Sequence, residues 1–182
     1  MPLTIRKLLR RHDRLTILSG AGISVDSPSS LPGAVQIMKC VLGELVPKSH
    51  SLFDRLPGVE QDPQRLLRFE TLLSVLQEYC DPDLRLLRVL DRTVPPNPNH
   101  QVCAGLLHDC GWHHVTCNFD TLIELAAENG AKHAFSTLVR TADFERWCDG
   151  QPALAKIHGS FRDAACRGAL STIRATLTTV GR

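Results

Sequence analysis

Short apolar runs alternate with longer amphipathic stretches along this chain of 182 residues. The β-branched run at 14–19, Arg-Leu-Thr-Ile-Leu-Ser, predicts a buried strand that ends at a glycine-rich turn. A second run at 114–118, His-Val-Thr-Cys-Asn, predicts another strand, and weaker strand signals lie at 133–135 and 153–157. Turn-forming residues fill positions 26–33 and predict a loop there.

Helical periodicity dominates the block between the first two predicted strands. The pattern predicts helices over 35–45, 63–79, 83–90 and 100–109. The proline-rich segment 94–99 predicts a rigid connector before the last of these helices. Ile23-Ser24 is expected to open a helix after the glycine turn. A later helix is expected to begin at Asp120-Thr121, where Thr121 and Glu124 have capping-box spacing, and a helical turn at 143–148.

Strands that alternate with helices indicate an α/β fold with a parallel sheet covered by helices on both faces. We therefore predict one domain over 1–182, with a Rossmann-like core at about 14–33 and 111–182. The block at about 34–110 is expected to be a helical insertion after the first strand.

Composition excludes several classes of function. The chain has 21 basic and 19 acidic side chains, a net charge of +2 and 5% aromatic residues, so direct nucleic-acid binding is not expected. No apolar run is long enough for a membrane span. Basic residues near the start lie beside Leu3, Ile5, Leu8 and Leu9 and predict an amphipathic first helix. A mitochondrial transit peptide is the alternative that we disfavour for this segment.

The seven cysteines are odd in number and scattered, which indicates reduced thiols and a cytoplasmic protein. No Cys-x-x-Cys pair occurs. Cys110, His113, His114 and Cys117 have metal-ligand side chains at short range, but they span a helix end and a strand. Because those side chains would point in different directions, we expect no metal there.

Three segments with candidate chemistry follow predicted strands, where an open α/β sheet places its ligand crevice. The first, Gly20–Ser24, could bring backbone N–H groups close to a phosphate. The second includes Asn118, which could bind a ribose hydroxyl or a water, and Asp120. The third includes His158, whose ordinary pKa suits proton transfer near neutral pH. Each has a structural alternative: a tight turn, a helix cap at Asp120, and a merely exposed histidine.

In this order, the three segments resemble those of the sirtuin superfamily. The resemblance consists of Gly-Ala-Gly-Ile-Ser at 20–24, Thr-x-Asn-Phe-Asp-x-Leu-Ile-Glu at 116–124 and Lys-x-His-Gly-Ser at 156–160. Pro-Asn-His at 98–100 and Phe-Glu-Thr-Leu-Leu at 69–73 are similar to its sirtuin-like branch. The resemblance to the sirtuin superfamily covers most of the chain from Leu15 to about Asp163.

The resemblance implies NAD as the substrate, with Asn118 and His158 as catalytic residues. The residues that it implies for NAD binding are Gly20, Ala21, Gly22, Ile23, Ser24, Asp26 and Asp120. Deacylating members follow the glycine motif with Gly-Ile-Pro-Asp-Phe-Arg, and residues 26–33 lack that phenylalanine and arginine. The four-cysteine zinc site of the deacylases is also absent, so no zinc is expected.

These departures favour the sirtuin-like NAD hydrolases, which include antiviral defence effectors of bacteria. The expected reaction cleaves NAD to nicotinamide and ADP-ribose. The alternatives are an NAD-dependent protein deacylase or ADP-ribosyltransferase, and a non-catalytic nucleotide-sensing or oligomerisation module of a larger protein. The Gly-Ser/Thr-Ser turn that holds the adenosine end of NAD in the family does not follow His158. We therefore expect either a fragment with further domains beyond Arg182 or an incomplete adenosine pocket, and a homo-oligomer is compatible with both.

Overall fold

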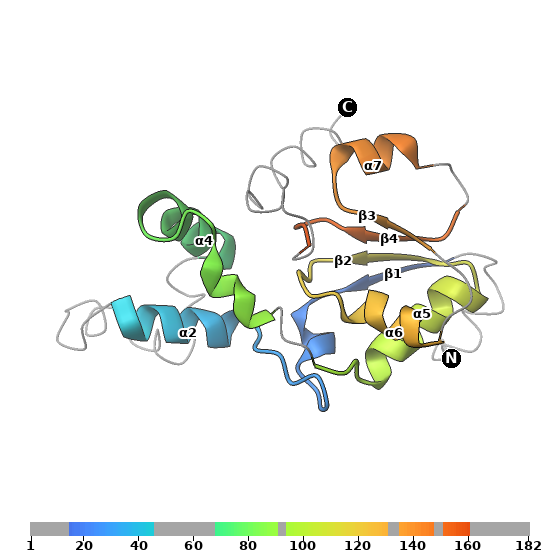
Figure 1. Ribbon diagram of the computed structural model, residues 1–182, viewed down its shortest axis with the longest axis horizontal. Coiled ribbons are helices and arrows are strands. Elements are labelled where there is room, and N and C mark those ends of the chain that lie inside the picture. The colour runs from blue at the N-terminus through green and yellow to red at the C-terminus, as the bar shows by residue number, and fades with distance from the viewer. Residues whose placement is uncertain (1–14, 46–67, 91–93, 131–134, 148–150, 161–182) are drawn as a thin grey trace, which may run out of the picture.

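A computed structural model of the chain describes residues 15–45, 68–90, 94–130, 135–147 and 151–160. Its sheet has four parallel strands, in the order β1 (Thr16–Ser19), β2 (His113–Thr116), β4 (Ala153–Lys156) and β3 (Ser136–Leu138). Helices separate consecutive strands along the chain, as parallel pairing requires. The α/β class predicted from the sequence is confirmed (Figure 1).

Helices α5 (Pro98–Asp109) and α6 (Leu122–Gly130) lie together on one side of the sheet, and α7 (Thr141–Arg146) lies on the other side, near β3 (Figure 1). A cluster of buried residues joins the first two helices to β4. Its members are Cys103, Ala104 and Leu107 of α5, Ile123 and Ala126 of α6, and Leu154 of β4. Burial of this apolar surface is what fixes α5 and α6 against the strands.

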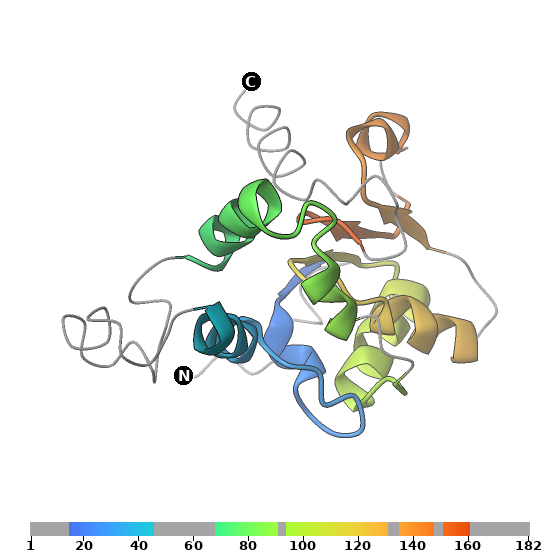
Figure 2. The same cartoon turned by 60° about the vertical axis from the view of Figure 1, so that its left-hand side comes forward.

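The remaining helices lie beside the sheet rather than on its faces, and Figure 2 brings them to the front. They are α2 (Ala34–Leu45), α4 (Phe69–Tyr79) and the 3₁₀ helix η3 (Arg85–Leu90). Their own core contains Met38, Leu72, Leu73, Leu76, Leu84 and Leu87. We call α2, α4 and η3 the helical layer. Phe119, from the loop after β2, packs against the core of this layer and so joins it to the sheet.

The start of α5 shows why the proline-rich connector stops at that point. Asn97 is fully buried, and its side-chain oxygen accepts hydrogen bonds from the backbone N–H groups of Asn99 and His100. Pro98 then takes the first helical position, where a missing N–H is not needed. The helix ends before Gly111, whose φ of +63° is the left-handed conformation that favours glycine.

Three helix predictions need correction. No α-helix opens at Ile23-Ser24; a 3₁₀ helix, η1 (Ala21–Ser24), is followed by a loop. The Asn97 side-chain amide donates to the Ile23 and Asp26 carbonyls and so holds this loop to the start of α5. The helix predicted at 83–90 is the 3₁₀ helix η3, preceded by Leu84 with a φ of +48°. The capping box of Thr121 and Glu124 is not formed, because Glu124 pairs with Lys156.

The other boundaries move by a few residues. Strand β1 is a sheet edge in the described part of the chain, and Leu18 is 73% exposed, so the prediction of a buried strand was wrong. Helix α4 begins at Phe69 after its cap Arg68. The predicted helical residues 63–67 and the predicted first helix lie outside the described residues. Strand β3 and helix α7 replace the predicted elements near 133–135 and 143–148.

None of the helices in the described part of the chain combines the length and apolar character that a bilayer crossing requires.

His114 on β2 is fully buried, and its Nε2 lies 2.6 Å from Ser19 Oγ, while its Nδ1 has no partner in the described ranges of the chain. Burial lowers the pKa of this imidazole from 6.5 to about 4. Protonation therefore favours the unfolded chain, so stability present above about pH 6.5 should be lost as the pH falls toward 4. The neutral His114 ring contributes about 3 kcal/mol to the free energy of unfolding in this way.

We expect His114→Gln to flatten this pH dependence, measured as the free energy of unfolding by denaturant titration across that pH range. His100 and His158 also have pKa values lowered by burial, so the comparison between variant and wild type isolates His114. The control is His108→Gln, which changes an exposed histidine of α5. Equal pH slopes for His114→Gln and wild type would contradict the assignment.

Candidate functional site

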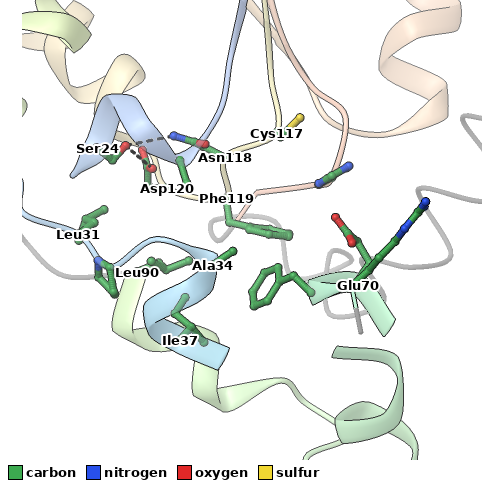
Figure 3. Close-up of a pocket in the computed structure, with 15 residues that line it drawn as sticks. Ser24, Leu31, Ala34, Ile37, Glu70, Leu90, Cys117, Asn118, Phe119 and Asp120 are labelled. Carbon is green, nitrogen blue, oxygen red and sulfur yellow. Dashed lines mark hydrogen bonds between the residues drawn. The ribbon is translucent and has the colours of Figure 1, made fainter. Parts of the chain in front are cut away.

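A pocket of about 430 Å³ lies where β1, β2 and β4 end, between the sheet and the helical layer (Figure 3). Its volume is within the range of small-molecule sites. The loops after the strands contribute Ala21, Ser24, Cys117, Asn118, Phe119, Asp120 and His158. The helical layer and the loop before it contribute Leu31, Pro32, Ala34, Ile37, Arg68, Phe69, Glu70 and Leu90.

The hydroxyl of Ser24 is the centre of a buried hydrogen-bond network at one wall of the pocket. Ser24 is 2% exposed, and its Oγ donates to Asp120 Oδ2 over 2.9 Å. The Asn118 Nδ2 donates to the same Oγ over 3.1 Å, and His100 Nε2 lies 3.0 Å from it. Asp120 Oδ1 accepts from the Leu122 N–H over 3.1 Å, which fixes the carboxylate at the start of α6. The helix-cap role considered for Asp120 is therefore confirmed.

The tautomer of His100 follows from its two contacts. The Asn97 backbone N–H donates to His100 Nδ1 over 3.1 Å, so Nδ1 is the unprotonated nitrogen of the neutral ring. Nε2 then holds the proton and donates to Ser24. Burial lowers the pKa of His100, although the nearby Asp120 opposes this, and the neutral ring is favoured. A histidine that donates to a serine cannot take that serine's proton, so Ser24, His100 and Asp120 are not a nucleophilic triad.

The same network sets the orientation of the Asn118 amide. Because the Ser24 hydrogen goes to Asp120, Ser24 offers Asn118 only acceptor lone pairs, and the Asn118 Nδ2 must face it. The Oδ1 then points away from Ser24 (Figure 3). This oxygen is buried and has no hydrogen-bond partner among the residues that the structure describes. A buried acceptor with no donor is uncommon in proteins and indicates a position where a ligand or water donates.

His158 lies in the pocket just after β4, and the centroid of its ring is 6.2 Å from that of Phe119. Burial lowers the pKa of this imidazole, while the negative charge of Glu70 raises it. Since burial is the larger effect, the ring is neutral near pH 7 and can accept a proton. The structure therefore places both predicted catalytic residues, Asn118 and His158, in one pocket.

The residues of the glycine turn, 20–24, face different parts of the structure. Ala21 and Ser24 line the pocket, whereas Ile23 packs against the α5–α6 cluster. A Cβ at Gly20 or Gly22 would meet no heavy atom within 4 Å, and neither glycine has a positive φ. Packing and backbone conformation therefore do not require glycine here, and the open space leaves the backbone accessible to close approach.

Asp26, also predicted to bind NAD, does not line the pocket, and the same is true of Gly20, Gly22 and Ile23. Asp26 is exposed, its carbonyl accepts from Asn97, and its carboxylate accepts from the Asn99 side chain over 3.4 Å. Its observed contacts join the loop after η1 to the start of α5.

Lys156 is a residue whose role the sequence did not reveal. Its side chain is fully buried, its Nζ donates to the Asp120 carbonyl, and it forms an ion pair of 3.0 Å with Glu124 Oε1. The lysine thereby joins the end of β4 to the loop that holds Asn118 and Asp120. A polar residue within an otherwise apolar strand was the signal that could have indicated a buried partner.

Glu70 is a second residue that sequence reasoning noted only as part of the resemblance. It lies in the first turn of α4 and its carboxylate faces the pocket (Figure 3). Burial, with a smaller effect of Glu70, raises the pKa of the Cys117 thiol. Cys117 is therefore protonated near neutral pH and is a poor nucleophile.

The short-range cluster of cysteines and histidines is spread over separate environments. The His113 ring contacts Trp147 edge-on, the His114 ring contacts Ser19, Cys110 is exposed, and Cys117 lines the pocket. The described residues include no group of three or more side chains suited to hold a metal ion.

Comparison with known proteins does not assign a family: no protein-family model matches the chain, and a search of curated proteins returns no significant match.

Replacing Ser24 with alanine tests the network. The variant Ser24→Ala leaves buried polar groups of Asn118, His100 and Asp120 without their shared partner, so we expect it to lower the free energy of unfolding by about 1–3 kcal/mol. The control Ser27→Ala changes an exposed serine of the following loop and should alter stability by less than about 0.5 kcal/mol. Equal stability of the two variants in denaturant titrations would show that the network contributes little.

Proposed function

We propose that this protein cleaves the nicotinamide–ribose bond of NAD and releases nicotinamide and ADP-ribose. The observation that supports this function best is the buried Oδ1 of Asn118, which has no partner among the described residues and belongs to the same pocket as the neutral His158. Together they offer a fixed hydrogen-bond acceptor and a proton acceptor in one pocket. The resemblance of the three loop segments to sirtuin-like sequences supports NAD as the substrate, and the geometry is compatible with it.

In the proposed reaction, the C–N bond between ribose and nicotinamide breaks, and its electron pair leaves with nicotinamide. Asn118 Oδ1 accepts a hydrogen bond from a ribose hydroxyl or from the attacking water and so orients it. The water oxygen forms the new bond to the ribose carbon, and His158 accepts the released proton. Positive charge that develops on the ribose ring would lie near the carboxylates of Asp120 and Glu70, which favours that charge.

The glycine turn supports a place for the pyrophosphate. The open space beside Gly20 and Gly22 would let phosphate oxygens approach the backbone. Arg68 is the arginine among the residues that line the pocket, and its exposed side chain would add a positive charge at the rim.

The test is to incubate the purified protein with NAD and to quantify nicotinamide and ADP-ribose by chromatography. Wild type should form both products in equal amounts. Asn118→Ala and His158→Ala should each lower the rate by about a hundredfold or more, because each removes an oriented hydrogen-bond or proton acceptor. A matched control is Asn99→Ala, which changes an exposed asparagine near the start of α5.

Folding of each variant is checked by its thermal unfolding. Unchanged turnover in both Asn118→Ala and His158→Ala would contradict the proposed mechanism. Faster nicotinamide release only in the presence of an acyl-lysine peptide, with deacylated peptide as a product, would instead establish a protein deacylase.

A further inference from the structure

The side-chain carboxylate of Glu70 has no hydrogen-bond donor within the described part of the chain. The backbone carbonyl of the same residue accepts from Ser74 Oγ. The residue is half-buried, lines the pocket and faces inward from α4 (Figure 3). Its electrostatic neighbours are His158 and Cys117, which lie across the pocket on the loops that follow the strands.

The position of α4 is fixed, so this charge is held in place. Leu72, Leu73 and Leu76 of the same helix are buried in the core of the helical layer. Phe69, the preceding residue, is packed against that core and also lines the pocket. The backbone of Glu70 is therefore held at the edge of the pocket, within reach of its side chain.

The other charged groups around the pocket do not neutralise Glu70. Asp120 is also an acid, and its carboxylate is already bound by Ser24 and by the Leu122 N–H. Arg68 is exposed and forms no ion pair with Glu70 in the described residues. Among the described residues that line the pocket, the two acids Glu70 and Asp120 thus outnumber the one arginine, Arg68. This excess of negative charge favours a cationic ligand over a neutral one of the same shape.

We propose that Glu70 makes the pocket selective for a ligand with a positively charged heterocycle, the oxidised pyridine dinucleotide, over its neutral reduced form. This inference rests on the proposed function. It adds to that function a specificity residue supplied by the helical layer, outside the three loop segments.

The experiment compares binding of two ligands by isothermal titration calorimetry. The first is a carbocyclic analogue of NAD, which keeps the charged pyridinium ring but has no cleavable glycosidic bond. The second is NADH, whose ring is neutral. The proteins are wild type, Glu70→Gln, which removes the charge but keeps the shape, and Glu78→Gln, the same change at an exposed position of α4.

We expect wild type and Glu78→Gln to bind the charged analogue more tightly than NADH. Glu70→Gln should weaken binding of the charged analogue by about tenfold and change binding of NADH by less than about twofold. The unchanged NADH affinity also reports that the pocket of the variant is intact. Equal effects of Glu70→Gln on both ligands, or no effect on either, would overturn the inference.

NAD cleavage is measured with the same wild-type preparation. This assay distinguishes a failure of the proposed selectivity from a failure of the proposed NAD hydrolysis. If wild type cleaves NAD but Glu70→Gln changes the affinities for the charged analogue and for NADH equally, only the selectivity is refuted. Absence of both cleavage and binding of either ligand would refute the proposed function and the selectivity together.

Discussion

The Ser24 hydroxyl hydrogen-bonds side chains from two distant parts of the chain, and the geometry of the pocket depends on these contacts. His100 is 76 positions away, and Asp120 is 96 positions away. One hydroxyl has a single hydrogen and two acceptor lone pairs, and all three are used here. This complete use leaves only one orientation for the Asn118 amide, with its oxygen free for a ligand.

Two further constraints keep the loops of the site together. Asn97 caps α5 and binds the carbonyls of Ile23 and Asp26, so the segment after β1 is tied to the start of that helix. Lys156 connects β4 to the carbonyl of Asp120 and to Glu124. A buried ion pair of this kind contributes little net stability by itself, but loss of one partner leaves an uncompensated charge. The loop with Asn118 and the loop with His158 are therefore positioned by the protein before any ligand binds.

Local sequence was sufficient for much of the fold and for the location of the site. The β-branched run at 14–19 predicted β1, the run at 114–118 predicted β2, and the weaker signal at 153–157 predicted β4. Side chains after the ends of parallel strands necessarily gather at one edge of the sheet, which brought Ser24, Asn118, Asp120 and His158 together. The exposure of β1 was not predictable, because it depends on which strands flank it. The 3₁₀ geometry of η3 depends on Leu84 and on Asp81, whose carboxylate binds the Leu86 N–H. The roles of His100, Lys156 and Glu70 arise from contacts between segments far apart in the chain, which residue spacing does not encode.

A crystal structure of the protein with the carbocyclic NAD analogue tests most directly whether this pocket binds NAD. We expect the pyridinium ring and its carbocycle between Asn118 and His158, with a carbocycle hydroxyl at hydrogen-bond distance, about 2.7 Å, from Asn118 Oδ1. We also expect phosphate oxygens next to the backbone of Gly20 and Gly22. An analogue bound elsewhere on the protein, with no ligand in the pocket, would refute NAD binding at this site.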